Sequence, residues 1–433
     1  MKKTTPRRRQ ASRTPKSAPT RPARCKHTVF QQVCNLIPGH LIPKLEREFK
    51  IDERGFTGTS HVQALLFGHA SHAWGLNDIC DSLAVHEAEF GRIREASAPA
   101  RNTFSNANRT RDPAMAEALY WKMLEHLRSV CPTFTQYRKH AGYIHRLKRD
   151  IFAVDSTTLP LTLNSINWAR HRRRKAAAKC HLRLNVGSFL PTCVRVEDAA
   201  HHDSVRAAAL CAGMIKGDIV LADRAYVDLE FLADLNSRGV LFVLRPKVNM
   251  LFRTVRKLPC SGKILRDVIV RPEGVKTAKT YQGPLRMVTA LVEVEGVERE
   301  MTFISNHLEW SPRTIVELYR ARWAIETFFK ELKQTLQLRD FVGTNEQAVK
   351  WQVWTGLLMH LLLRFLRHVS RWGHSFSRCV GIVRSALWVK VLLVELLRYY
   401  GTAGSPRWTW SVPKELFLPG FERLVRVPMG QPG

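Results

Sequence analysis

The sequence predicts an α/β fold with helical regions at both ends of the chain. Between residues 145 and 245, short apolar segments of strand type alternate with helical segments, a pattern typical of a sheet with helices on its faces. Residues 246–310 carry strand patterns separated by Gly and Pro turns, which predicts an all-β insertion. The chain has 433 residues, 45% of them hydrophobic, enough to build several domains.

The charge balance indicates a polyanionic partner. Lys and Arg number 68 against 37 Asp and Glu, a formal net charge of +31. This excess is spread along the whole chain, which favours DNA or RNA over an anionic membrane surface. A membrane-surface protein would carry a basic amphipathic helix with a clean apolar face, and we find none in the sequence. The longest apolar runs are also too short to span a bilayer, so no membrane partner is expected.

Cysteine usage and the N-terminal residues favour the cytoplasm. The nine cysteines include no pair with CxxC spacing, so they predict neither a zinc site nor a disulfide framework. A reducing compartment suits such a set. The N-terminus has no apolar segment of signal-peptide type. We therefore expect a cytoplasmic protein.

The first part of the chain divides into a basic arm and a helical module. Residues 1–27 are rich in Lys, Arg and Pro and lack acids, which predicts a disordered arm that contacts phosphates. Residues 28–135 carry helical patterns and a polar segment with three arginines at 97–113. We interpret this module as a DNA-binding domain, with an ordinary helical bundle as the alternative. Its predicted helices cover 29–36, 41–49, 59–69, 76–83 and 114–130.

Two short apolar strands of the predicted core each end in an acid. The strand at 151–154 is followed by Asp155, and the strand at 218–222 by Asp223. Ligands of an open α/β sheet gather at the carboxyl ends of its strands, so these carboxylates would be adjacent if the strands pair. A single Asp at a strand end is more often a turn or helix-cap residue, and only the joint occurrence favours a functional site.

Further elements complete the predicted core and insertion. After the insertion, residues 311–345 are expected to hold the final core helix, and 346–433 a C-terminal helical region and tail. The other expected strands are 180–189, 192–196, 240–244, 253–255, 263–270, 285–294 and 298–304, and the other expected helices are 202–214, 228–237, 346–369 and 377–400.

The final core helix, predicted at 318–338, carries a stripe of polar residues. Tyr319, Arg322, Glu326 and Lys333 fall within roughly 60° of one another at about 100° per residue. The carboxylate can hold a metal ion, and the cations and the phenol can hold a phosphate. The alternative is a solvated face with ordinary Glu–Lys pairs.

Three acids could therefore converge: Asp155, Asp223 and Glu326. Close carboxylates repel, and a proton or a metal ion must relieve the repulsion. Hard oxygen ligands with open positions suit Mg²⁺ or Mn²⁺. Two such ions would activate an attacking oxygen and stabilise the leaving oxygen of a phosphodiester.

A basic cluster follows the first acid. Arg172, Arg173, Arg174 and Lys179 stand close together in the sequence, and we expect them to contact DNA phosphates.

Four other polar or aromatic residues are weaker candidates. His181 and His202 are expected to be structural or to contact phosphate rather than to bind metal. Trp310 and Trp323 could stack on a flipped base, although core packing is expected for Trp323.

Three motifs resemble the catalytic motifs of DDE transposases of the insertion-sequence-four family. They are VDST at 154–157, LADRAY at 221–226 and Y-x₂-R-x₃-E-x₆-K at 319–333, and the last matches the YREK motif at all four positions. Ala225 stands where family members usually have Gly, which narrows the turn's permitted backbone angles but leaves the carboxylate in place. Other segments that resemble the family lie at 56–83, 102–111, 179–186 and 196–204.

The resemblance implies a ribonuclease-H-like core with a β insertion before the last catalytic helix. It implies DNA cleavage and strand transfer with Mg²⁺, or Mn²⁺ as a substitute, held at a two-metal site by Asp155, Asp223 and Glu326. Tyr319 and Arg322, together with Lys333 of the same motif, would bind phosphates of the element's end. The implied partners are the terminal inverted repeats and target DNA, both double-stranded, and a second copy of the chain in a homodimer, in the bacterial cytoplasm and on the nucleoid.

Two other functions remain open from the sequence. A nuclease with the same core would cut DNA without joining it. A non-catalytic DNA-binding derivative would be favoured by loss of any of the three acids, and all three are present.

Overall fold

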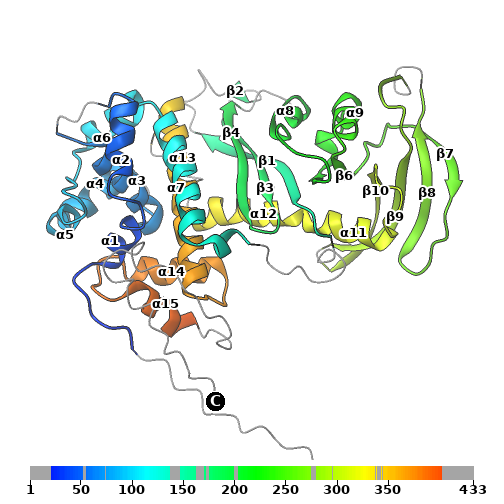
Figure 1. Ribbon diagram of the computed structural model, residues 1–433. Coiled ribbons are helices and arrows are strands. Elements are labelled where there is room, and N and C mark those ends of the chain that lie inside the picture. Colours follow the sequence, from blue (N-terminus) through cyan, green and yellow to red (C-terminus); the bar gives the residue numbers. More distant parts are fainter. Residues whose placement is uncertain are drawn as a thin grey trace, which may run out of the picture.

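The computed structural model divides into a helical body and a large sheet, and a helical segment at residues 312–335 runs along the sheet toward the helical body (Figure 1). Arg172, Arg173, Arg174 and His202 lie outside the described residues, as do residues 402–433 of the tail. The structure describes residues 21–51, 55–73, 75–136, 147–161, 170–171, 175–198, 203–274, 279–294, 296–336, 338, 343 and 345–401.

The N-terminal helices confirm most of the helical prediction. The polar segment 97–113 is the exception, because ten of its residues form helix α6. Its narrow buried face of Phe104, Ala107 and Asn108 is hidden in the sequence among polar neighbours. The helices are α1 (Val29–Cys34), α2 (Leu41–Glu48), α3 (Gly58–Ser71), α4 (Leu76–Val85), α5 (Glu87–Gly91), α6 (Arg101–Thr110) and α7 (Ala114–Val130), followed by the short 3-10 helix η1 (Pro132–Thr135).

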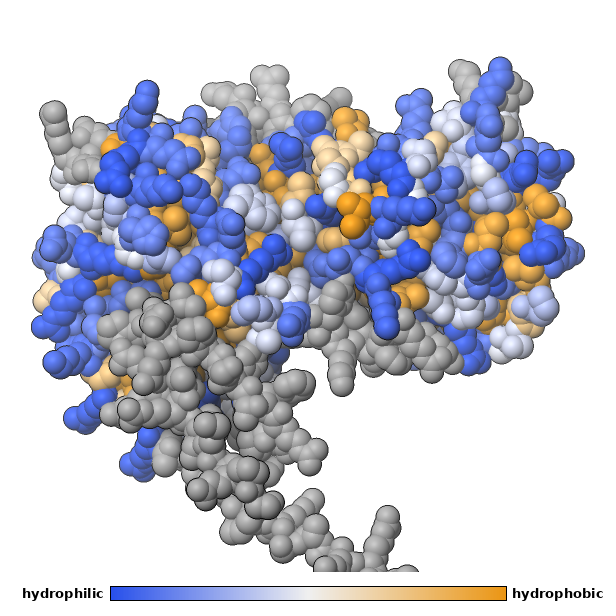
Figure 2. Space-filling model, in the orientation of Figure 1, coloured by the Kyte–Doolittle hydropathy of each residue, from blue (hydrophilic) through white to orange (hydrophobic). Residues whose placement is uncertain are grey.

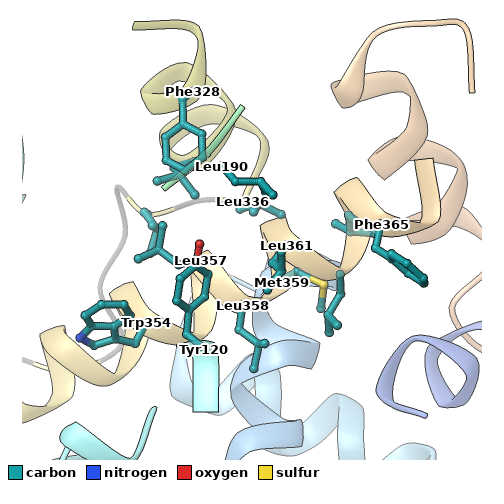
Figure 3. Close-up of a cluster of buried hydrophobic side chains, with 14 of the residues drawn as sticks. Tyr120, Leu190, Phe328, Leu336, Trp354, Leu357, Leu358, Met359, Leu361 and Phe365 are labelled. Carbon is teal, nitrogen blue, oxygen red and sulfur yellow. The ribbon is translucent and has the colours of Figure 1, made fainter. Parts of the chain in front are cut away.

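Helix α13 (Glu346–Val369) was predicted with the correct bounds, and it joins the helical body to the rest of the molecule. It packs against α7, α3 and α6. Most of its side chains are buried, in keeping with its nearly continuous apolar pattern. Figure 3 shows Trp354, Leu357 and Leu361 of α13 in one cluster with Tyr120 of α7.

The predicted helix at 377–400 is wrong, because two shorter helices stand there. They are α14 (Phe376–Ser385) and α15 (Leu393–Gly401). The carbonyl groups of Leu387 and Lys390 accept hydrogen bonds from Phe30 and Cys25, so the intervening segment is paired with the N-terminal region instead of continuing a helix. The described part of the predicted disordered arm is therefore held against the fold.

Within the described residues the sheet has ten strands, and its core combines antiparallel and parallel neighbours. The core strands lie in the order β4–β3–β1–β5–β6. Strand β3 is antiparallel to both β4 and β1, whereas β1, β5 and β6 are parallel to one another. This order fits the ribonuclease-H-like core that the resemblance implies. The strands are β1 (Ile151–Leu161), β2 (Arg170–His171), β3 (Lys175–Asn185), β4 (Leu190–Asp198), β5 (Ile219–Ala222), β6 (Leu241–Leu244), β7 (Phe252–Lys257), β8 (Ile264–Pro272), β9 (Leu285–Val294) and β10 (Val297–Ser305).

The β insertion continues the sheet of the core. Strand β10 pairs antiparallel with β6, at Ile304 with Leu244 and at Ser305 with Val243. Strands β9, β8 and β7 follow outward in order (Figure 1). The pairing gives the edge of β6 hydrogen-bond partners that it would otherwise lack.

Helices cover both faces of the core sheet. Helices α8 (Asp203–Leu210) and α9 (Leu229–Ser237) pack in one hydrophobic cluster with Val154 and Ala222. The neighbouring residues Ala153 and Leu221 belong to the other cluster, which includes the buried residues of α11 and α12. Because side chains alternate along a strand, Asp155 and Asp223 face the α11–α12 side.

The visible surface is mostly hydrophilic, with hydrophobic side chains between the polar ones (Figure 2). Exposed hydrophobic residues of the insertion include Val248, Leu251 and Val255. Among the described residues, we find no helix with the length and apolar character that a membrane span requires.

Candidate active site

Asp155 and Asp223 stand side by side at the end of the parallel pairing between β1 and β5. The last parallel partners are Val154 and Ala222, and each Asp is the next residue of its chain segment. Strand β1 does not end there as predicted, because it continues to Leu161 beside β3 alone. Asp155 therefore lies within a strand, at the point where its neighbour on one side stops.

Backbone amides orient both carboxylates. Ser156 donates its N–H to Asp155 Oδ1 at 2.8 Å, and Arg224 donates its N–H to Asp223 Oδ1 at 2.7 Å. Each of these bonds engages only the first oxygen of its carboxylate.

The helical segment opposite these strand ends is interrupted, whereas the sequence predicted one helix at 318–338. It begins six residues earlier, as α11 (Pro312–Ala321), and resumes as α12 (Trp323–Lys330). Its last turn is the π-helix η5 (Glu331–Thr335). Arg322 occupies the junction between α11 and α12 and is buried.

Arg322 connects two of the three predicted acids. Its Nη1 donates to Asp155 Oδ2 at 3.3 Å and its Nη2 to Glu326 Oε1 at 2.5 Å. The Arg322 side chain is 8% exposed, the Asp155 side chain 22% and the Glu326 side chain 51%. The contact thus places the exposed carboxylate of α12 opposite the strand ends.

Tyr319 reaches the second strand end. Its hydroxyl lies 3.5 Å from Asp223 Oδ1, the outer limit of a hydrogen bond. Its ring packs on Phe303 of β10 at 4.7 Å and under the Arg322 guanidinium at 5.3 Å. The β10 strand of the insertion therefore supports this side of the site.

Lys333 lies farther along β1. Its Nζ donates to the Thr158 carbonyl at 2.6 Å. Thr158 is paired in register with Lys179 of β3, so both predicted phosphate-binding lysines stand at this level of the sheet. Lys333 is thereby held three residues beyond Asp155 along β1. Side chains alternate along a strand, so Lys179 projects from the opposite face of the sheet to Asp155.

The electrostatics of the site balance burial against charge. Burial raises the pKa of Asp155 to about 6, Asp223 and Glu326 add to the rise, and the Ser156 amide and Arg322 oppose it. Burial also acts to lower the pKa of Arg322, but Tyr319 and the neighbouring carboxylates outweigh it, so the pKa is raised and the guanidinium stays charged.

The three acids have the right chemistry for a hard divalent cation, and their charges interact. In this structure, however, a guanidinium lies between Asp155 and Glu326. Among the described residues, no three His, Cys, Asp or Glu side chains come close enough together to hold a metal ion. The carboxylate oxygens are the kind of donor that such an ion prefers, and the Arg322 guanidinium occupies the position between two of them.

The remaining candidates play smaller parts. His181 is fully buried on β3, with Nε2 3.2 Å from Glu197 Oε1, as a structural residue would be. Trp310 stacks on His307 at 4.2 Å. Trp323 is 43% exposed, so the expectation that it packs in the core is wrong; as the first residue of α12 it faces solvent.

A pair of polar residues behind the site escaped the sequence reasoning. His360 of α13 is buried, and its Nε2 lies 2.7 Å from Glu331 Oε2 in the π-helical turn. The contact ties the end of the helical segment to α13. The available signal was a His and an Arg, at 360 and 364, inside an otherwise apolar helix.

Comparisons with known proteins identify the family. The family model described as "Transposase DDE domain" matches residues 146–362, which include all three acids, and a "Domain of unknown function (DUF4372)" matches residues 25–90. The chain is 27% identical over 51% of its length to the "Probable transposase for insertion sequence element IS5377" of Geobacillus stearothermophilus, covering 58% of that protein. It is 27% identical over 53% of its length to the "Putative transposase y4zB" of Sinorhizobium fredii, covering 64%.

Two more distant likenesses accompany these. A "Putative transposase for insertion sequence element IS4SA" of Synechocystis is 24% identical over 69% of this chain and 80% of its own length. The likeness to the cryo-EM structure of a piggyBac transposase synaptic complex with hairpin DNA covers 90% of this chain and 85% of that one, at 11% sequence identity and a TM-score of 0.43. The chain spans about 60% of the first two relatives. The match across half of the chain confirms the DDE transposase part of the resemblance: the chain belongs to the family of the transposase DDE domain.

Proposed function

We propose that this chain is a DNA transposase that binds the ends of a mobile element, cuts the DNA and joins the freed 3′-hydroxyl ends to target DNA. One observation carries the proposal. In a chain of the DDE family, Asp155 and Asp223 adjoin at the end of a parallel strand pair, and Glu326 docks beside them through Arg322.

The three carboxylates are the residues that would hold divalent cations. We propose Mg²⁺, with Mn²⁺ as a substitute, in a two-ion site. When bound, these ions would activate the oxygen that attacks the phosphodiester and would neutralise the charge on the oxygen that leaves it. The raised pKa of Asp155 is consistent with a carboxylate placed to meet a cation.

The chain's own cations would position the phosphates. Arg322 has partly exposed partners and an Nε without a hydrogen-bond partner among the described residues, so it can exchange Asp155 and Glu326 for a phosphate. Tyr319 would hold a phosphate beside Asp223, and Lys333 would act as a point charge farther along β1. Catalysis would then rest on positioning and charge neutralisation.

The helical body would recognise the DNA ends. Helix α6 presents Arg101, Asn102, Asn106 and Arg109 to solvent and contains no acid. Arginine and asparagine are the side chains that most often read base edges in the major groove. A homodimer that brings two ends together on the nucleoid, and phosphate contacts from Arg172, Arg173, Arg174 and the arm at 1–27, belong to the same proposal.

The central test is Glu326→Gln. This variant should bind a duplex that carries the DNA flanking the gene as wild type does, and lose Mg²⁺-dependent cleavage by at least about a hundredfold. Glu346→Gln is the matched control, because it makes the same change at an exposed Glu–Lys pair on α13. Undiminished cleavage by Glu326→Gln would contradict the assignment of Glu326 as a catalytic acid.

A joining assay separates transposase from nuclease. A pre-cut duplex with a 3′-hydroxyl end is incubated with plasmid DNA and Mg²⁺, and covalent joining is scored on a gel. Joined product supports strand transfer. Cleavage without joining would leave the nuclease function in its place.

A further inference from the structure

The carboxyl end of the catalytic helical segment is held by three side chains from outside the core. The Thr335 carbonyl accepts hydrogen bonds from His72 Nε2 at 2.6 Å and from Arg384 Nη2 at 3.2 Å. The Leu336 carbonyl lies 3.1 Å from His69 Nδ1, which must carry the proton because a carbonyl only accepts. We call His69, His72 and Arg384 the C-terminal clamp.

Arg384 joins two helix ends that would otherwise repel. Its Nε donates to the Ala70 carbonyl at 3.1 Å, near the end of α3, while its Nη2 binds Thr335. The carboxyl ends of helices leave carbonyl groups unpaired and carry partial negative charge. A guanidinium between the two ends satisfies carbonyls on both sides. It therefore links the helical body to the catalytic segment through one side chain.

His72 adopts a backbone conformation that L-residues avoid. It caps α3 at the carboxyl end with φ 62°, in the left-handed region. For a residue with a Cβ this costs roughly 1–2 kcal/mol, and such residues cluster at functional sites. In this conformation the imidazole reaches Thr335, so the backbone strain coincides with the contact to the catalytic segment.

The π-helical turn explains why the segment needs outside partners. Residues Glu331–Thr335 form a π-helical turn in place of α-helical hydrogen bonds. Regular α-helical bonding therefore does not fix the direction of the Lys333 side chain. The C-terminal clamp binds Thr335, two residues after Lys333. Beyond it Leu336 is buried in the cluster that Figure 3 shows, with Leu190 and Leu361 beside it.

We infer that His69, His72 and Arg384 are positioning residues for the DNA reaction. They fix the end of the catalytic segment so that Lys333 stays on β1 at Thr158 and Glu326 stays opposite the strand ends. They also make that placement depend on α3 of the helical body. The inference deepens the proposed function and rests on its assignment of Glu326 and Lys333.

The test compares His72→Gly, His72→Gln and Arg384→Ala with wild type. His72→Gly removes the donor and relieves the left-handed backbone, so it is expected to fold. Its single-turnover cleavage of a saturating duplex of flanking DNA should fall on the order of tenfold, because a small misplacement of a catalytic group costs at least that much. His72→Gln keeps an N–H donor and should recover most of the rate. Arg384→Ala should lose as much as His72→Gly.

Binding and amide exchange separate positioning from general damage. The Kd for the duplex should stay within about twofold of wild type in every variant. Without DNA or metal, the amide protons of residues 333–336 should exchange faster in His72→Gly, and those of β5 should not. Arg378→Ala on the same helix α14 is the matched control, since Arg378 is exposed and no contact joins it to Thr335 in the described structure.

The outcomes distinguish this inference from the proposed function. A wild-type protein that fails to cleave any flanking duplex contradicts the proposed function, and the exchange measurement still tests the clamp. Wild-type cleavage rates in both His72→Gly and Arg384→Ala, or unchanged exchange at 333–336, would overturn the clamp alone. If Arg384→Ala does not fold, the pair His72→Gly and His72→Gln decides.

Discussion

Arg286 and Arg322 both bind carboxylates, but in different ways. Arg286 of β9 donates from Nε and Nη2 to the two oxygens of Asp267 on β8, at 2.8 and 2.7 Å, and from Nη1 to the Leu308 carbonyl. Both side chains of this pair are buried, at 9% and 1% exposure. Arg322 divides its guanidinium between two acids, and its Nε has no hydrogen-bond partner among the described residues.

The difference indicates which pair serves the fold and which serves a reaction. The bidentate, buried pair of Arg286 and Asp267 has its hydrogen bonds satisfied, so it holds β8 and β9 together and has no free group to offer a new partner. A guanidinium with divided contacts and a half-exposed acid can release its carboxylates to other cations and take a phosphate instead. The same chemical groups thus give a fixed joint in the insertion and an exchangeable one at the strand ends.

The largest expected effect is at the fixed joint. Asp267→Ala should lower the free energy of unfolding by roughly 3–5 kcal/mol, because it leaves the buried Arg286 charge without its partner. Urea unfolding followed by circular dichroism measures this loss. Asp234→Ala is the matched control: it removes the partner of Arg238 on the surface of α9, where 51% of the carboxylate side chain is exposed. The control should cost less than about 0.5 kcal/mol. Equal losses in the two variants would contradict the distinction between buried and exposed pairs.

A smaller effect, of opposite sign, is expected at the exchangeable joint. The folded protein raises the pKa of Asp155 to about 6, chiefly by burial, so it favours the neutral carboxyl. The stability that the neutral Asp155 carboxyl gives the folded protein is present below about pH 4 and is lost as the pH rises through about 6. Asp155→Asn remains neutral at every pH. It should therefore be more stable than wild type above pH 6, by up to about 3 kcal/mol, and equal to it near pH 4.

The measurement is urea unfolding of both proteins in EDTA between about pH 4 and pH 8. The comparison at the low-pH end is the internal control, because the two side chains then carry the same charge. A variant less stable than wild type at pH 8 would mean that the ion pair with Arg322 outweighs burial. The same substitution is expected to abolish cleavage, so stability and activity should change in opposite directions at this position.

Much of this site follows from the sequence because it depends on local patterns. The runs before Asp155 and Asp223 are strands, and they pair side by side so that the two acids are adjacent, as expected, although β1 continues beyond Asp155. Helices α7 and α13 have the bounds that their apolar periodicity predicts.

What escaped prediction depends on contacts between distant segments. The π-helical turn at Glu331–Thr335 contacts His360 of α13, His72 at the end of α3 and Arg384 of α14. Only His360 leaves a trace in the sequence, as a polar residue in an apolar helix, and that trace does not name its partner. The joining of the insertion to the core likewise rests on β6 and β10, about 60 residues apart. The break of the helical segment at Arg322 belongs to the same class, because that residue binds Asp155 of the distant strand β1.

The smallest expected effect concerns metal binding without DNA. Arg322→Gln removes the cation that now lies between Asp155 and Glu326, and Gln cannot neutralise them. The affinity for Mn²⁺ should rise on the order of fivefold, about 1 kcal/mol, measured by isothermal titration calorimetry. Binding is the better measure here, since Arg322 is also proposed to hold a DNA phosphate and its loss would lower cleavage for that reason. Arg320→Gln is the control, because it removes the same charge from an exposed position two residues away. If the two variants bind Mn²⁺ equally, the guanidinium does not compete with the ion, and the contacts of Arg322 belong with the fixed joint of Arg286.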